Sequence, residues 1–250
     1  MDDSQFITAP PPSPGRSRPS SVPMNPLPPN PELLHSLGRM VRGLSALFWG
    51  LPIALIVCIG IASAGWFQMY NVVPPIVVTG LVAFGIWQLD SFQKQERPWR
   101  NALDRAKIFA LINVGLSPFV FWWNHGPSLF FFDVCVSVLA LSAWFFIFSL
   151  NTVLLRLGAM LPDETLRQET RQFTSLNQSL LLLLLALKGV RAVLARIPHL
   201  PDQFQALLEI WDRWGNWLLI LLALLPLAMT MALIWKTKEV ILESVFGVKN

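Results

Sequence analysis

Charged residues are scarce in this sequence. Asp, Glu, Lys and Arg make up 14% of its 250 residues, whereas they account for about 25% of an ordinary soluble domain. Hydrophobic residues make up 54%, and the mean hydropathy is +0.52. A soluble domain of this length has no core large enough for so much apolar surface. The composition therefore excludes a soluble globular protein and predicts an integral membrane protein, with the lipid bilayer as its first partner.

The residues that build disulfide frameworks and metal sites are also few. The two cysteines, Cys58 and Cys135, both fall inside apolar segments, which argues against a disulfide framework. The three histidines, His35, His125 and His199, are isolated and show no metal-ligand spacing. We therefore expect neither a metal site nor a cofactor.

Catalytic signatures are missing as well. The sequence contains no G-x-S-x-G elbow, no H-E-x-x-H pair, no P-loop and no paired carboxylates on one intramembrane face. These absences favour a non-enzymatic protein. The net charge of +4 is small and is better interpreted as an orientation signal than as affinity for nucleic acid, so no nucleic-acid partner is expected.

The first 33 residues differ in composition from the rest. Ten prolines lie between Pro10 and Pro31, with serines and two arginines among them. Such a segment buries too little apolar surface to fold, and it has no apolar region of the kind found in a secretory signal peptide. Residues 1–33 are therefore predicted to be a disordered Pro/Ser-rich cytoplasmic tail.

The remaining residues, 34–250, are predicted to form an all-α, polytopic transmembrane helix bundle. About 20 residues of helix cover a hydrocarbon core of about 30 Å, and six apolar segments come close to this length. The predicted spans are 44–65, 72–89, 107–123, 129–154, 174–194 and 216–235.

The fifth of these spans decides between six crossings and five. Residues 180–187 are seven leucines and one alanine, followed by Lys188 and Arg191. A helix lying in the interface needs a polar face, and this stretch has none, so it must be buried as a spanning or re-entrant segment. Both cations can reach the outer headgroups by extending their side chains. We expect a crossing, with residues 163–178 extending the helix into the cytoplasm; five spans are the alternative.

Lysine and arginine alternate between the two sides of the predicted bundle. Arg39 and Arg42 precede the first span, five basic residues lie from Lys94 to Lys107, and three lie from Arg156 to Arg171. The loops between these groups, "WFQMYN" and "NHGPS", contain no basic residue. This positive-inside pattern predicts a cytoplasmic N-terminus. The short loops favour a bacterial inner membrane.

Ionisable and polar residues inside the spans are the candidate functional residues. Asp133 lies about one turn into the fourth span, and we hypothesise an intramembrane ion pair between Asp133 and either Lys188 or Arg191. Neutral polar residues form a candidate polar path, although hydrogen bonds between helices are the favoured interpretation. These residues are Asn113, Ser117, Ser142, Asn151 and Thr230.

Three functions are compatible with these patterns. The first is a non-enzymatic subunit or scaffold of a membrane assembly, bound to a protein partner or to further copies of itself. The second follows from topology: six spans, a basic helix between the second and third, and an external segment at 199–214 are similar to the permease subunits of ABC exporters. That resemblance implies a cytoplasmic ATPase docked on residues 90–107. The third is a lipid-modifying enzyme at the outer surface that uses Asp133 and His125.

Overall fold

The structure is a computed structural model that describes residues 31–64, 71–90, 96–125, 130–160, 164–194 and 216–246. Every regular element in these ranges is a helix, which confirms the predicted all-α transmembrane bundle. The helices are α1 (Pro31–Ala64), α2 (Val73–Leu89), α3 (Arg97–Leu116), α4 (Pro118–His125), α5 (Phe130–Met160), α6 (Glu164–Leu194) and α8 (Asn216–Phe246). Of the predicted tail, only its last three residues lie in the described part, at the start of α1. The external segment predicted at 199–214 lies outside it.

Five described segments are long and apolar enough to cross a membrane. The remaining predicted span, the second at 72–89, corresponds to α2, which has 17 residues. At 1.5 Å per residue α2 is about 26 Å long, which is the lower limit for crossing a hydrocarbon core of about 30 Å. The five longer segments are His35–Ile61, Arg97–His125, Phe130–Met160, Arg167–Arg191 and Leu221–Glu243.

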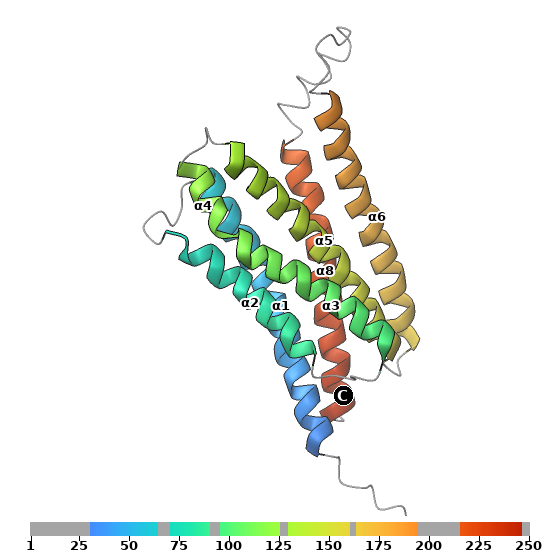
Figure 1. Ribbon diagram of the computed structural model, residues 1–250. Helices are drawn as coiled ribbons and strands as arrows, with labels where there is room; N and C mark the ends of the chain where they lie inside the picture. Colours follow the sequence, from blue (N-terminus) through green and yellow to red (C-terminus); the bar gives the residue numbers. More distant parts are fainter. Residues whose placement is uncertain are drawn as a thin grey trace, which may run out of the picture.

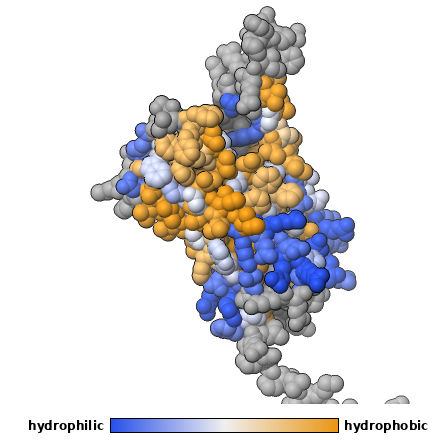
Figure 2. Space-filling model, in the orientation of Figure 1, coloured by the Kyte–Doolittle hydropathy of each residue, from blue (hydrophilic) through white to orange (hydrophobic). Residues whose placement is uncertain are grey.

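The long helices alternate in direction along the chain (Figure 1). α1, α3 and α6 run one way, and α2, α5 and α8 run back, so that the start of α1 and the end of α8 lie at the same end of the bundle. Figure 2 shows an apolar belt on this face and a hydrophilic surface below it, where α3 begins and α5 ends. Exposed arginines near the ends of these helices include Arg97, Arg100, Arg105, Arg156, Arg167 and Arg171.

Proline divides the third span, whereas the cations of the fifth span do not interrupt their helix. α3 ends at Leu116 and α4 begins at Pro118, because proline lacks an N–H and its ring clashes with the preceding turn. The third predicted span is therefore divided between two helices, α3 and α4. In contrast, α6 continues through Lys188 to Leu194.

Glycines bring α1 and α2 close together. A Cβ atom added to Gly43 would lie 2.7 Å from the Gly85 carbonyl oxygen, and one added to Gly85 would lie 2.8 Å from Leu47 Cγ. A Cβ atom on Gly50 would lie 3.1 Å from Val82 Cγ2. Since the first two distances are shorter than real Cβ contacts, only residues without a Cβ permit this approach. We call Gly43, Gly50 and Gly85 the glycine seam.

The buried core extends from this seam through α3, α5 and α8, and α6 packs at its edge. Trp99 of α3 is 1% exposed, and Ile234 of α8 is fully buried. α6 packs mainly against α5 and α8. Leu182, Leu183 and Val190 of α6 are exposed and face outward. The attachment of α6 therefore depends on its inner face.

Candidate functional site

Three buried polar side chains meet where α5, α6 and α8 come together. Asn151 lies on α5, Asn177 on α6 and Thr230 on α8, and each is 0% exposed. We call these three side chains the amide hub. Asn151 and Thr230 are among the polar residues named from the sequence, and the structure brings them together. Asn177 was missed although it lies in the predicted span 174–194, because it also belongs to the polar stretch 163–178 that was interpreted as an extension into the cytoplasm.

Hydrogen bonds between side chains close the amide hub. Asn177 Nδ2 donates to Asn151 Oδ1 at 3.0 Å and to Thr230 Oγ1 at 2.9 Å. Asn151 Nδ2 donates to Thr230 Oγ1 at 3.1 Å, and the Thr230 hydroxyl donates to the Pro226 carbonyl oxygen at 2.8 Å. Each of the three helices is thus bonded to the other two. Because lipid offers no replacement partners for these groups, the bonds stabilise the packing of α6.

The inner face of α6 remains polar beyond the hub. Thr170 and Thr174 are each 1% exposed and follow the helical spacing that ends at Asn177. Gly158 of α5 leaves room for this face, since a Cβ atom there would lie 3.2 Å from Thr170 Oγ1. Within the described residues, both threonine hydroxyls, Asn177 Oδ1 and the Thr237 hydroxyl of α8 lack a hydrogen-bond partner. Polar side chains therefore line the inner face of α6 from Thr170 to Asn177.

A tryptophan supplies another attachment of α6. Trp144 of α5 is 9% exposed, and its Nε1 donates to the Leu181 carbonyl oxygen of α6 at 2.9 Å. Its ring stacks on Phe148 with centroids 6.0 Å apart. Trp144 lies in the middle of its predicted span rather than at an interface, and this hydrogen bond accounts for that position.

The other polar residues named from the sequence lie at other helix contacts. The Thr79 hydroxyl of α2 donates to Ser117 Oγ at 3.3 Å. The Ser142 hydroxyl of α5 donates to the Phe109 carbonyl oxygen of α3 at 3.4 Å. Asn113 is 9% exposed, and its Oδ1 has no partner among the described residues. A polar path through these residues stays a prediction.

The hypothesised ion pair also stays a prediction. Asp133 lies in the first turn of α5 and is exposed. Lys188 is exposed and Arg191 half-buried near the end of α6. Figure 1 draws the start of α5 and the end of α6 apart from each other. Within the described residues, no ion pair joins Asp133 to Lys188.

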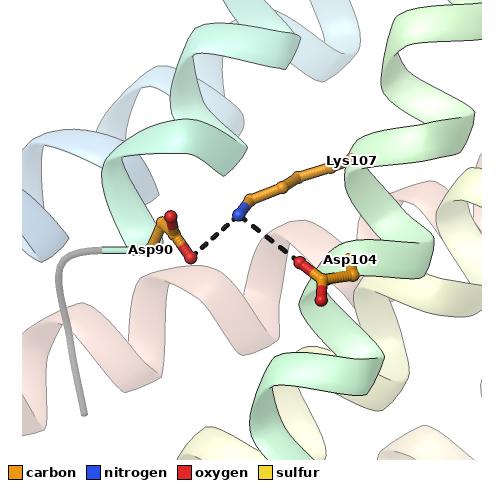
Figure 3. Close-up of polar contacts among 3 residues, drawn as sticks. All are labelled: Asp90, Asp104 and Lys107. Carbon is orange, nitrogen blue, oxygen red and sulfur yellow. Dashed lines mark ion pairs between the residues drawn. The ribbon is translucent and has the colours of Figure 1, made fainter. Parts of the chain in front are cut away.

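Two ion pairs that the sequence analysis did not name connect helices at the basic end. Lys107 Nζ of α3 lies 2.8 Å from Asp90 Oδ1 at the end of α2 and 3.6 Å from Asp104 Oδ1 (Figure 3). Lys236 of α8 pairs with Glu169 of α6. The i,i+3 spacing of Asp104 and Lys107 was a sequence signal only for the contact within α3.

The described residues hold no group of three or more histidine, cysteine, aspartate or glutamate side chains that could bind a metal ion. Cys58 and Cys135 are free thiols. His125 Nδ1 lies 2.9 Å from the Phe121 carbonyl oxygen of its own helix. This local contact orients the ring along α4.

Comparison of the chain with protein-family models, with curated proteins and with solved structures gave no match. The geometry of the amide hub and of the basic end is therefore the basis for a functional proposal.

Proposed function

We propose that this protein is a non-enzymatic subunit or scaffold of a membrane assembly. The observation that carries this proposal is that polar side chains inside the predicted spans form hydrogen bonds between helices. Asn151, Asn177 and Thr230 are hydrogen-bonded to one another, and Ser117 and Ser142 contact neighbouring helices. Groups that are engaged in this way stabilise a fixed helix arrangement, which is what a scaffold requires.

The distribution of cations supports an orientation for this scaffold. Exposed arginines lie at the start of α3, at the end of α5 and at the start of α6, all at the end of the bundle that also holds the start of α1. By the positive-inside rule we place this end in the cytoplasm. The membrane we propose is a bacterial inner membrane.

Gentle extraction of the tagged full-length chain from native membranes tests the scaffold role. We expect at least one integral membrane protein, or a second copy of the chain, to co-purify in a fixed ratio. The same extraction of the Asn177→Leu variant is the matched comparison, because loosening α6 should reduce the amount of partner recovered. Recovery of the wild-type chain alone as a monomer would contradict the proposal.

A transporter permease is the second candidate, and the start of α3 favours it. Arg97, Arg100 and Arg105 are exposed there, next to the pair that Lys107 forms with Asp90. An ATPase with an acidic groove could dock on residues 90–107 at this position. For this candidate the extraction should recover a stoichiometric ATPase, and Arg100→Glu should release it while Arg171→Glu on α6 should not. ATPase recovery that is equal in both variants would remove the α3 docking site.

A further inference from the structure

A cavity of about 380 Å³ lies between the first part of α3 and the last part of α5. It is separate from the amide hub, although Thr152 of its lining accepts a 3.4 Å hydrogen bond from Gln178 of α6. Six of the residues that line it form two matching rows. They are Arg97, Asn101 and Arg105 on α3, and Phe148, Thr152 and Arg156 on α5.

Each row follows a four-residue spacing and therefore lies along one face of its helix. The two helices run in opposite directions (Figure 1). Contacts one turn beyond the cavity define their register. Phe109 stacks on Phe145 with ring centroids 5.4 Å apart, and the Phe109 carbonyl oxygen accepts a hydrogen bond from the Ser142 hydroxyl. The same register places Arg97 opposite Arg156, and Arg105 opposite Phe148.

This arrangement directs cations toward the middle of the cavity. In a helix each Cα–Cβ bond tilts toward the helix N-terminus. On antiparallel helices, Arg105 therefore tilts toward the start of α3 while Arg156 tilts toward the start of α5, so both side chains lean toward the level of Thr152. Arginine presents a planar set of donors that matches the oxygens of a phosphate group.

The lining carries three positive charges and no compensating carboxylate. None of the nine described residues that line the cavity is acidic. Asp104, the neighbour of Arg105, lies 3.6 Å from Lys107 instead. Ser149 also lines the cavity and is 8% exposed. The cavity therefore offers donors and positive charge to an anion.

The position of the cavity relative to the predicted spans indicates where that anion comes from. Arg105 and Arg156 lie within two residues of the ends of the predicted spans 107–123 and 129–154, which is the level of the lipid headgroups. Phe148 and the buried Ala102 form an apolar part of the wall. We propose that this cavity binds the phosphate of an anionic phospholipid headgroup, with the start of the acyl chains against Phe148.

Native mass spectrometry of the purified full-length chain tests this proposal. Dioleoylphosphatidylglycerol and dioleoylphosphatidylcholine are added separately to the protein in detergent, and bound lipids are counted. We expect the anionic lipid to bind more tightly. The double variant Arg105→Gln with Arg156→Gln should weaken its binding about tenfold or more, because each cation near the membrane surface contributes severalfold.

The control removes two other exposed arginines, which do not line the cavity. Arg167→Gln with Arg171→Gln on α6 should change binding of phosphatidylglycerol by less than about threefold. Equal losses in both double variants would mean diffuse attraction and would overturn the site. Displacement of the lipid by millimolar inorganic phosphate would overturn the lipid as ligand. Should the first double variant fail to fold, Arg105→Gln alone tests the same prediction and is expected to weaken binding severalfold.

Discussion

The glycine seam and the amide hub hold neighbouring helices together by opposite means. At the seam, Gly43 and Gly85 bring the backbones of α1 and α2 into direct contact. At the hub, Asn151, Asn177 and Thr230 reach across the space between three helices with their side chains. Because lipid is as apolar as a leucine side chain, neither contact relies on the hydrophobic effect.

The difference shows which changes each region can accept. The seam depends on the absence of Cβ atoms at its glycines, so a larger side chain there should separate the two helices. The hub depends on particular oxygen and nitrogen atoms, so it should fail when those atoms are removed at constant volume. α6 is attached through the hub, and should therefore be more sensitive than α2 to the removal of a polar side chain.

Gly43→Val should give the largest loss of stability. The new Cβ atom would lie 2.7 Å from the Gly85 carbonyl oxygen and 2.9 Å from Gln88 Cβ, and neither backbone can move without separating α1 from α2. We expect a loss of about 3 kcal/mol in the free energy of unfolding. The measurement is equilibrium unfolding in mixed micelles titrated with sodium dodecyl sulfate.

Gly38→Val on the same helix is the matched control. No atom lies within 4 Å of a Cβ added there, so its effect should stay below about 0.5 kcal/mol. If both valine variants unfold at the same detergent fraction, close backbone contact does not hold the seam together.

Asn177→Leu should have the next largest effect. It removes the donors to Asn151 Oδ1 and Thr230 Oγ1 while keeping a similar volume. Asn177 Nδ2 also donates to the Pro226 carbonyl oxygen at 3.1 Å, so three interhelical contacts of about 0.6 kcal/mol each are lost. The Thr230 hydroxyl, at 3.4 Å, is then the remaining donor to Asn151 Oδ1. We expect a loss of about 2 kcal/mol in the same unfolding measurement.

The control for this variant is Gln172→Leu, an exposed amide on the same helix, which should change stability by less than about 0.5 kcal/mol. A double-mutant cycle with Thr230→Val isolates the hub. Strict additivity of Asn177→Leu and Thr230→Val would show that the two side chains are not energetically coupled.

The helices could be predicted from the sequence because a chain in lipid can satisfy its backbone hydrogen bonds in few ways. Backbone groups without water must bond within the segment, so a long apolar run such as 129–154 forms a helix. The break at Pro118 and the continuation of α6 past Lys188 follow from equally local rules. The same is true of the opposite directions of successive helices, since the loops between them are short.

The contacts between helices could not be predicted in the same way. Asn177 lies among polar neighbours, and nothing in a single sequence shows that its helix face turns inward. The contact of Gly43 with Gly85 depends on the register of two different helices. The arginine-lined cavity likewise requires the pairing of α3 with α5 to place Arg97 opposite Arg156. Register between helices is a property of packing, which periodicity within one helix does not contain.

Trp144→Phe tests a single hydrogen bond between α5 and α6, and its effect on stability should be smaller than that of Asn177→Leu. The substitution removes the donor to the Leu181 carbonyl oxygen but keeps an aromatic ring near Phe148. We expect a loss of about 1 kcal/mol in the free energy of unfolding, the usual contribution of one hydrogen bond. Trp122→Phe, at a tryptophan that is 43% exposed, should be nearly neutral. A loss of the same size in Trp122→Phe would assign the effect to lost ring area instead.

The smallest effect is expected at the basic end, where charges join α2 to α3. Lys107→Gln removes both contacts of its ammonium group, to Asp90 at 2.8 Å and to Asp104 at 3.6 Å. The Asp90 and Asp104 side chains are 48% and 57% exposed, so solvent screens the pairs and the loss should be about 0.5 kcal/mol. Asp90→Asn should reproduce most of it and Asp104→Asn little, because Asp90 alone connects the two helices. Raising the salt concentration to 1 M should remove the difference between wild type and Lys107→Gln. A difference that persists in high salt would mean that Lys107 acts through the packing of its alkyl chain, as the glycine seam does, rather than through polar atoms, as the amide hub does.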